Sequence, residues 1–434
     1  MDAVYSQESK LEPIGLIRAS RTVVRTGTML LAAGSGSYRV KSSMKALGRA
    51  LGMSDVHAQV TINEITATCH RGPMYRTEVA QTATIGVNSD RIKLIQTYCE
   101  ALEPADETTS PEEIARRLDD AEAFLDAAEA KPHLYPDWLN SLCAAIACGA
   151  FAFLNNGGPV EIGAVLIGAF LGQYSRRLML HRHLNQLAVA MIAGAVASIV
   201  YLGLAHGMYL AGLVESIHES GYISAVLFLV PGFPLITAAL DLSHLDFSAG
   251  MSRLAYALMI MISAALSVWA VSTLWGLTPI PQEKHELVPW ALFAFRLLAS
   301  ALGVWGFAMI FNSPFIVAVV AAGVGMIANT ARLVLMDAGL FTQGAAFFAG
   351  LIVGVLCNLI APRLDIPRIT LSVPAVVIMI PGAAGYRAIY YLNAGDTLQA
   401  LAYGVEAVFV VIAVAVGLTF ARTLTDRNWL VTGK

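Results

Sequence analysis

The sequence YISAVLFLVPGFPLITAALD, residues 222–241, decides the fold class of this chain. The run is apolar and long enough to cross a bilayer, yet Pro231, Gly232 and Pro234 interrupt its middle. A proline inside a helix removes one backbone donor and clashes with the carbonyl one turn earlier. In lipid, a carbonyl freed in this way must lie against protein, a cavity or a ligand. The stretch is therefore either a proline kink, which is common in membrane helices, or a broken helix that lines a site.

A second interrupted run favours the broken helix. Residues 371–391 read LSVPAVVIMIPGAAGYRAIYY, and Pro381 and Gly382 stand where Pro231 and Gly232 stand in the first run. Two interrupted helices at matching positions of two halves indicate the binding site of a secondary transporter. The pair therefore predicts a transport site at the two breaks.

Composition separates a polar part of the chain from a membrane part. Apolar residues make up 56% of the 434 residues and charged residues 14%, and the charged ones concentrate in residues 1–137. The first long apolar run begins only at Trp138, so we expect no signal peptide and a polar part that stays in the cytoplasm. The 5 cysteines are scattered without CxxC spacing, which argues against disulfides and zinc sites. We expect neither a metal nor a cofactor.

Residues 1–137 are predicted to form a small cytoplasmic α+β domain. Apolar spacing predicts helices near 16–31, 40–51, 92–102 and from Ser110 onward, and alternation predicts strands near 56–62 and 79–85. Ser110 and Glu113 are predicted to form a capping box around Pro111. The domain shows no paired acid and base, nucleophile elbow or metal cluster, so we expect a regulatory or gating role and no enzyme.

The membrane part is predicted to contain ten spans in two repeats. The repeats cover 138–281 and 282–434, with five spans each and a short carboxyl-terminal tail. Pro159 precedes Arg177 by the same interval that separates Pro314 from Arg332. An odd number of spans per repeat forces opposite orientations, so we predict an all-α polytopic fold with a 5+5 inverted repeat. The predicted spans are 138–154, 160–180, 186–205, 222–241, 250–275, 289–311, 315–335, 341–361, 371–392 and 398–420.

Basic residues set the expected orientation in the membrane. The inner loops carry Arg176, Arg177 and Arg182 among others, whereas the outer loops at 155–159, 206–221, 276–288 and 393–397 supply only Lys284. Both termini are therefore predicted to be cytoplasmic, in a chain that crosses the inner (plasma) membrane.

Charged residues inside the spans are candidates for function, because each costs about 2.5 kcal/mol or more at the bilayer centre. Glu406 lies deepest, about 14 Å along its helix. It is interpreted either as the ion-pair partner of Arg387 or Arg296 or as a proton-carrying carboxyl, and both roles can hold together. Asp241 and Arg253 are equally well explained as interface residues. The candidate coupling residues are Glu406, Arg253 and Arg296.

These residues resemble a known family over nearly the whole chain, the threonine/serine exporter family of secondary transporters. The family's Pro-Gly-x-Pro-Leu pattern with a following Asp, Gly and Arg is matched by 231–235, Asp241, Gly250 and Arg253. Its second pattern, Pro-Gly and then Tyr-Arg, is matched by 381–382 and 386–387. The resemblance implies export of threonine and serine, or of succinate-like dicarboxylates in relatives split over two polypeptides, driven by the membrane potential or the proton gradient.

The sequence therefore predicts a secondary exporter of small amino acids, with a dicarboxylate as the alternative solute. The helix amino ends after the two breaks would hold the solute carboxylate, and Arg387 would add two parallel hydrogen bonds. A channel, or a membrane-embedded enzyme in which Glu406, Asp241 and His244 converge, remains open as another class. The expected partners are the solute, protons and lipid, without nucleic acid; a homo-oligomer is left open. The candidate substrate-binding residues are Pro231, Gly232, Pro234, Thr237, Asp241, Pro381, Gly382, Gly385, Tyr386 and Arg387.

Overall fold

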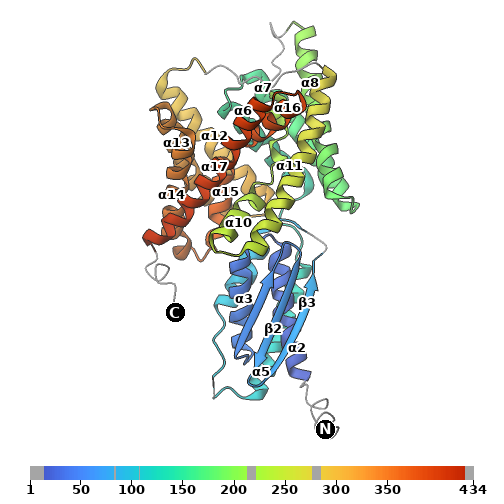
Figure 1. Ribbon diagram of the computed structural model, residues 1–434, viewed down its shortest axis with the longest axis vertical. Coiled ribbons are helices and arrows are strands. Elements are labelled where there is room, and N and C mark those ends of the chain that lie inside the picture. Colours follow the sequence, from blue (N-terminus) through green and yellow to red (C-terminus); the bar gives the residue numbers. More distant parts are fainter. Residues whose placement is uncertain (1–13, 83–84, 107, 213–220, 276–284, 426–434) are drawn as a thin grey trace. The chain divides into compact units, whose positions relative to one another are not determined.

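The contacts within the chain divide it into two units. Residues 1–132 and 240–253 form the first unit, and residues 133–239 and 254–434 form the second. The computed structural model describes residues 14–82, 85–106, 108–212, 221–275 and 285–425 (Figure 1). The short segment 240–253, which the sequence assigns to the first membrane repeat, thus contacts the amino-terminal residues. The predicted repeat boundary at 281–282, Lys284 and most of the tail after Arg422 lie outside the described residues.

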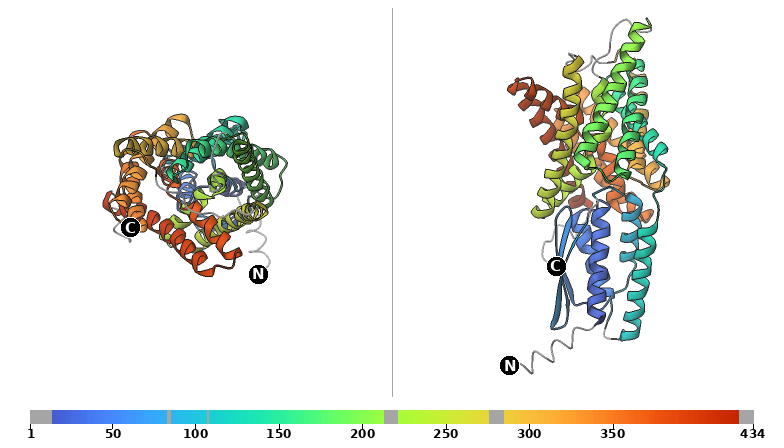
Figure 2. Two further views of the ribbon diagram at one scale, coloured as in Figure 1. Left: turned by 90° about the horizontal axis from the view of Figure 1, so that it is seen from above. Right: turned by 90° about the vertical axis from the view of Figure 1, so that its right-hand side faces the viewer.

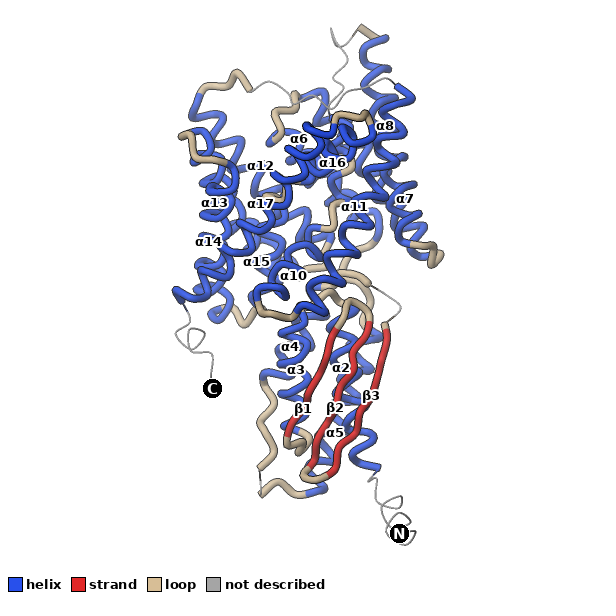
Figure 3. Tube along the Cα trace, viewed as in Figure 1, coloured by secondary structure: helices blue, strands red, loops and turns tan. Residues whose placement is uncertain are grey.

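In its described residues, the first unit combines four amino-terminal helices with a three-stranded antiparallel sheet of order β1-β2-β3 (Figure 3). Helices α2 and α3 lie on one face of the sheet. Helices α4 and α5 pack on the side of α2 and α3 that faces away from the sheet (Figure 2, right). In chain order the elements are α2 (Ile14–Ala32), α3 (Ser37–Ala50), β1 (Asp55–Val60), β2 (Glu64–Arg71), β3 (Met74–Gln81), α4 (Ser89–Glu100) and α5 (Pro111–Ala130).

The central strand β2 shows why the sheet has one buried face. Its Ile65, Ala67 and Cys69 are fully buried, while the alternating threonines Thr66 and Thr68 are only partly buried. This period of two is that of a half-buried strand. The sequence prediction missed β2 because the small and polar residues in it carry little hydrophobic contrast. The strand predicted near 79–85 is β3, which begins earlier and ends at Gln81.

Helix α5 begins as the sequence predicts, although half of the predicted capping box is wrong. The Ser110 hydroxyl accepts a hydrogen bond from the Glu113 backbone N–H at 3.2 Å, and Pro111 occupies the first helical position. The Glu113 carboxylate pairs with Arg117 one turn later, at 2.8 Å. The Glu113 side chain, which a capping box requires, thus binds the cation four residues later in the same helix.

Helices are the regular elements of the second unit in its described residues. Helices α10 and α11 each contribute residues to both units. The elements are α6 (Asp137–Leu154), α7 (Pro159–His181), α8 (Gln186–Leu210), α9 (Gly221–Ala225), the 3-10 turn η1 (Leu227–Leu229), α10 (Gly232–Ser243), α11 (Phe247–Trp275), α12 (Pro289–Ile310), α13 (Phe315–Asp337), α14 (Thr342–Ile360), the 3-10 turn η2 (Ala361–Arg363), α15 (Arg368–Val377), α16 (Gly382–Asn393) and α17 (Thr397–Thr425).

Seven of the described helices are long and apolar enough to cross a membrane, and the bent pair α15–α16 raises this number to eight. The seven are α6, α8, α11, α12, α13, α14 and α17. The predicted spans at 160–180 and 222–241 correspond to α7 and to α9–η1–α10, which are not among them. The chain is therefore a polytopic membrane protein, and the count of ten spans stays a prediction.

Glycines bring the membrane helices close together. A Cβ on Gly350 of α14 would lie 2.4 Å from the Val414 carbonyl oxygen of α17, and one on Gly417 of α17 would lie 2.3 Å from the Phe347 carbonyl oxygen of α14. Figure 1 shows these two helices side by side. Since lipid is as apolar as leucine, membrane helices associate through such close backbone packing.

Candidate functional site

Both interrupted runs are broken at the predicted positions. In the first, the chain passes from α9 through η1 to Val230, and α10 begins at Gly232. In the second, α15 ends at Val377 and α16 begins at Gly382, with the two helix axes 51° apart. The local hydrogen bonds match: the Gly232 N–H donates to Val230 O at 2.7 Å, and the Gly382 N–H donates to Ile380 O at 2.8 Å.

The two breaks lie against each other. A Cβ on Gly232 would lie 2.8 Å from Ile380 Cδ1, and a Cβ on Gly382 would lie 2.7 Å from Val230 Cγ2. Each glycine therefore contacts a side chain just before the other break, and a larger residue at either place would push the breaks apart. The Tyr386 hydroxyl, at 3.5 Å from Val226 O, adds a polar contact between the second run and the first.

The other predicted residues of the broken helices differ in how deeply they are buried. Thr237 is fully buried and donates back to Phe233 O at 2.9 Å, so its hydroxyl is used within α10. Gly385 and Tyr386 are buried, whereas Arg387 is partly exposed and lies 5.9 Å from the ring centroid of Tyr403. Arg387 is thus the charged candidate that remains accessible beside the breaks.

A small polar pocket adjoins Arg387. It lies where the start of α9, the end of α6, the start of α7 and α16 meet, and it has room for about one water molecule. Its polar side chains come from Asn155, Glu161, Ser224 and Arg387. Glu161 is only 2% exposed, and its Oε2 accepts a hydrogen bond from the Gly158 N–H at 2.7 Å. Glu161 is not among the residues predicted from the sequence, although an acid in the first turn of an apolar span meets the same criterion as Glu406.

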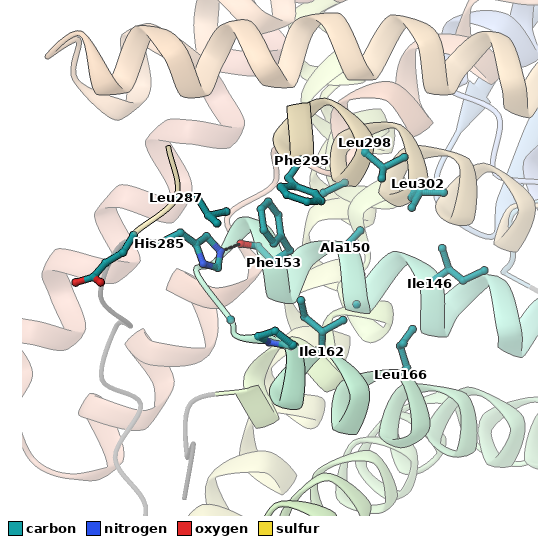
Figure 4. A pocket seen from close by; sticks show the side chains of 15 residues that line it. Ile146, Ala150, Phe153, Ile162, Leu166, His285, Leu287, Phe295, Leu298 and Leu302 are labelled. Atoms are coloured by element: carbon teal, nitrogen blue, oxygen red, sulfur yellow. Dashed lines mark hydrogen bonds between the residues drawn. The ribbon is translucent and has the colours of Figure 1, made fainter. Parts of the chain in front are cut away.

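A larger cavity of about 870 Å³ lies between α6, α7 and α12 (Figure 4). Leucine, isoleucine and phenylalanine side chains form most of its wall, and the His285 Nε2 lies 3.0 Å from Phe153 O at one end. An apolar wall of this kind offers few partners to the charges of an amino acid or a dicarboxylate. The polar pocket at Arg387 is the better candidate for a charged solute.

A second charged cluster belongs to the first unit and contains Asp241 and Arg253. The Asp241 carboxylate accepts from the Ser37 N–H at 2.9 Å, at the amino end of α3, where the cap position Gly36 has no side chain of its own. The Arg253 guanidinium donates to Ser35 O at 2.5 Å, just beyond the carboxyl end of α2. Each charge thus has the sign that stabilises the helix end it contacts.

The two charges of this cluster also face each other. Arg253 Nε and Asp241 Oδ2 are 3.2 Å apart, within ion-pairing distance but outside hydrogen-bond geometry, and both side chains are less than 5% exposed. The loop 34–37, which the sequence marks only by its glycines and serines, supplies their other partners. The structure therefore brings Asp241 and Arg253 to the amino-terminal helices.

Asp246 extends this cluster at the turn between α10 and α11. Its carboxylate accepts hydrogen bonds from Lys41 Nζ at 2.5 Å and from the Ser37 hydroxyl. Burial alone would raise the pKa of Asp246, but these hydrogen bonds and the Lys41 charge outweigh it and lower the pKa below its ordinary value. Beside it, the rings of Tyr38 and His244 stack with centroids 5.0 Å apart.

The remaining predicted charges are not brought together. Arg296 of α12 pairs with Asp337 of α13, a pairing that the sequence does not predict. Glu406 is half-buried on α17, and within the part of the chain that the structure describes it forms no ion pair. Of the two partners considered for Glu406, Arg296 is thus engaged elsewhere.

Comparison with known proteins shows the family. A family model described as a threonine/serine exporter matches residues 21–275, and a second, also described as a threonine/serine exporter, matches residues 296–424. This chain belongs to the threonine/serine exporter family. Members of this family are transporters and not enzymes.

Curated relatives of the threonine/serine exporter family match along most of the chain. A protein of Corynebacterium glutamicum named "Threonine/serine exporter" is 23% identical over 96% of this chain and 86% of its own length. A protein of Mycobacterium tuberculosis named "Probable threonine/serine exporter" is 24% identical over 86% of this chain and 70% of its own length. A protein of Klebsiella aerogenes named "Probable succinate transporter subunit YjjP" is 27% identical over 59% of this chain and 94% of its own length. No solved structure matches the chain.

Proposed function

We propose that this protein is a secondary exporter of small amino acids such as threonine and serine, working by alternating access. The observation that carries the proposal is the reciprocal packing of the two breaks, in which Gly232 contacts Ile380 and Gly382 contacts Val230. Because each break contacts the other, a movement of one half changes the surroundings of both helix amino ends at once. Membership of the threonine/serine exporter family supports this assignment.

The solute carboxylate would bind at the amino ends of α10 and α16. Gly232, Gly382 and Gly385 let backbone donors approach it, and the guanidinium of Arg387 can hold it with two parallel hydrogen bonds. Because lysine cannot form that fork, Arg387→Lys should weaken transport strongly although the charge is kept. A succinate-like dicarboxylate, the solute in the name of the Klebsiella aerogenes relative, is the second candidate because it too carries a carboxylate.

The chain is proposed to be an inverted repeat of five plus five spans. Support comes from corresponding helices of equal length: α7 and α13 have 23 residues each, and α10 and α16 have 12. The proposed parts are a cytoplasmic α+β domain over 1–137 and repeats over 138–281 and 282–434. Both termini would face the cytoplasm across the inner membrane.

Orientation can be tested with single cysteines. A cysteine introduced within 282–286 should react with an impermeant thiol reagent from outside the cell, and one within 363–368 should not. Reaction of only the second cysteine would contradict the proposed orientation.

Glu406 is the proposed coupling residue. A half-buried carboxyl in a span can carry a proton, whereas an amide cannot. Glu406→Gln should therefore leave solute exchange intact while it abolishes accumulation driven by a proton gradient. Loss of both activities together with expression would instead indicate a structural role, and wild-type levels of both would indicate neither role.

The amino-terminal unit is proposed to regulate or gate transport, with Asp241 and Arg253 holding residues 240–253 to it and not touching the solute. Their hydrogen-bonding groups already face Ser37 N and Ser35 O. Removing residues 1–130 should change the rate of transport while the membrane domain still binds the solute. Loss of solute binding in the truncated chain would contradict this role.

Counterflow in proteoliposomes tests the function directly. Saturable exchange of labelled threonine, serine or succinate would support a carrier and identify the solute class. Flux that does not saturate would favour a channel, and consumption of the solute would favour an enzyme.

A further inference from the structure

We infer that Arg176 and Arg332 bind the solute carboxylate at the two ends of the transport path, Arg176 at the cytoplasmic end and Arg332 at the outer end. This role rests on the proposed function and on the proposed inverted repeat, and it adds two solute contacts away from the breaks. Arg176 belongs to α7 and Arg332 to α13, the second helix of each repeat.

The turns that precede these two helices show that the arginines correspond. Each turn has an asparagine in the left-handed conformation, Asn156 with φ 68° and Asn312 with φ 57°, and the backbone hydrogen bonds that close the two turns match one for one. Each arginine follows its asparagine by 20 residues. The proline intervals in the sequence instead pair Arg332 with Arg177, so the structure shifts this match by one residue.

Each arginine lies three residues after a buried amide side chain on the same helix. Arg176 Nη1 donates to Gln173 Oε1 at 3.4 Å, and Arg332 Nε donates to Asn329 Oδ1 at 3.0 Å. The two amide residues are 2% and 0% exposed. Both guanidinium groups are thus held from one side by an oxygen inside the helix bundle.

The preceding helix orients both amides. Gln173 Nε2 donates to Asn140 Oδ1 of α6 at 2.8 Å, and Asn329 Nδ2 donates to Ser300 Oγ of α12 at 2.9 Å. Because the nitrogen of each amide is used in this way, its oxygen is the atom that faces the arginine. The same arrangement of arginine, amide and helix contact therefore occurs in both repeats, as expected for a function that each repeat performs at its own side of the membrane.

Among the described residues, the two arginines have no acidic partner. Asp137, which contacts the end of α7, pairs with Arg177 at 2.6 Å, and Asp337 at the end of α13 pairs with Arg296. A charged side chain that faces the interior of a membrane bundle is costly and typically marks the path of a solute or ion. A guanidinium has five N–H donors, so it can hold a carboxylate with two parallel hydrogen bonds while it keeps its amide contact.

Both arginines lie on the helix face that packs toward a broken helix. A Cβ on Gly172, one turn before Arg176, would lie 2.9 Å from a phenylalanine side chain of η1. A Cβ on Gly325, two turns before Arg332, would lie 3.0 Å from a backbone oxygen of α15. Residues four or seven positions apart share a helix face. Since α7 and α13 run in opposite directions in an inverted repeat, the two arginines lie on opposite sides of the breaks.

Transport measured separately at each membrane face tests this role. Right-side-out and everted membrane vesicles containing the full chain are loaded with unlabelled threonine, and the KM for exchange with labelled external threonine is determined. Arg176→Gln should raise the KM at least about tenfold in everted vesicles, which expose the cytoplasmic face, and less than about twofold in right-side-out vesicles. Arg332→Gln should have the reverse effect.

Further variants separate solute binding from a structural role. Arg177→Gln is the matched control, because it removes the adjacent arginine, whose charge Asp137 balances, and it should keep the wild-type KM at both faces. Lysine at position 176 or 332 keeps the charge and loses the fork, so its KM should lie between those of the wild type and the glutamine variant. Thermal unfolding of the glutamine variants should occur no earlier than that of the wild type, because each removes a cation from the bundle interior.

The outcomes distinguish this role from the function on which it rests. Unchanged KM values in the folded glutamine variants, or an equal rise at both faces, overturn the inference alone. Effects at interchanged faces keep it and reverse the proposed orientation. In proteoliposomes of phosphatidylcholine alone, a wild-type KM as high as that of the glutamine variants would show that the arginines bind lipid phosphate, which also overturns it. If the wild type exchanges neither threonine, serine nor succinate, the proposed function fails and the inference with it.

Discussion

The turn from α10 to α11 and the turn from α16 to α17 have the same backbone and different surroundings. In the first, the Asp246 N–H donates to Asp241 O at 2.9 Å; in the second, the Asp396 N–H donates to Tyr391 O at 2.9 Å. The positions of Asp241 and Arg253 correspond to those of Tyr391 and Tyr403, since Pro231 matches Pro381. The ion pair of the first turn is thus replaced in the second by two tyrosine rings, stacked at 5.7 Å.

The difference shows what a buried ion pair requires. Asp241 and Arg253 are buried because the loop 34–37 supplies backbone donors and acceptors for them. Residues 392–399 of the second turn are exposed, and its two tyrosines close the turn by stacking on each other. The first turn therefore packs on the loop 34–37 of its own unit, whereas the second turn is closed by its own two tyrosines.

Breaking the buried pair should have the largest effect. Arg253→Gln leaves the Asp241 carboxylate buried without its cation, which should cost about 3–5 kcal/mol in the free energy of unfolding. Tyr403→Leu in the second turn should cost about 1 kcal/mol. Thermal unfolding of the purified protein in detergent measures both. A double variant, Asp241→Asn with Arg253→Gln, should recover part of the loss, and equal effects of the two single variants would contradict the distinction between the turns.

Substitutions at the break glycines should have the next largest effect and should be alike in the two halves. Gly232→Ala and Gly382→Ala each place a methyl group within 3 Å of a side chain of the other break, so each should cost about 1–3 kcal/mol. Threonine counterflow should fall in both. Gly323→Ala, where a Cβ would meet nothing within 4 Å, is the matched control. Unequal losses from the two break variants would show that the halves do not contribute equally.

The aspartates that follow the two helices should differ in pH dependence. Asp246→Asn should cost about 1 kcal/mol at neutral pH, because Lys41 loses its charged partner. The pKa of Asp246 is lowered in the folded state, so its contribution is complete above its unfolded pKa of about 3.9 and is lost as the pH falls through the folded value. The penalty of Asp246→Asn should accordingly shrink at acid pH in unfolding measurements.

Asp396→Asn is the counterpart in the second turn. The Asp396 side chain accepts from the Gln399 N–H at 3.1 Å, and an asparagine oxygen can accept the same hydrogen bond. The variant should change stability by less than about 0.5 kcal/mol. A larger loss than that of Asp246→Asn would reverse the comparison.

Effects of opposite sign are expected where the two turns reverse direction. Leu245 has φ 61° and is 76% exposed, and Gly395 at the corresponding place has φ 83°. This left-handed conformation is unfavourable for leucine and free for glycine. Leu245→Gly should raise and Gly395→Ala should lower the stability by about 0.5–1 kcal/mol in thermal unfolding. A loss in both would mean that Leu245 makes a contact that outweighs its backbone strain.

The sequence by itself determined the membrane class, the places of both breaks and the approximate ends of the long helices. These features are local: hydropathy over about 20 residues identifies a span, and proline and glycine interrupt a helix where they stand. The start of α5 at Ser110 was readable for the same reason. Strand β2 was missed because its buried face uses small residues, whose contrast with the outer face is weak.

Only the tertiary structure decided which groups meet. From the sequence, Arg253 was interpreted as an interface residue or a coupling residue. Its partners Ser35 and Asp241 could be identified only from the tertiary structure, in which α2, α3 and the α10–α11 turn lie together. Glu161 and Arg387 are separated by most of the membrane domain along the chain, yet they line one pocket. The energy of a buried charge depends on the atoms around it, and segments distant in the sequence supply those atoms. Hydropathy and residue spacing therefore do not predict which charges lie together.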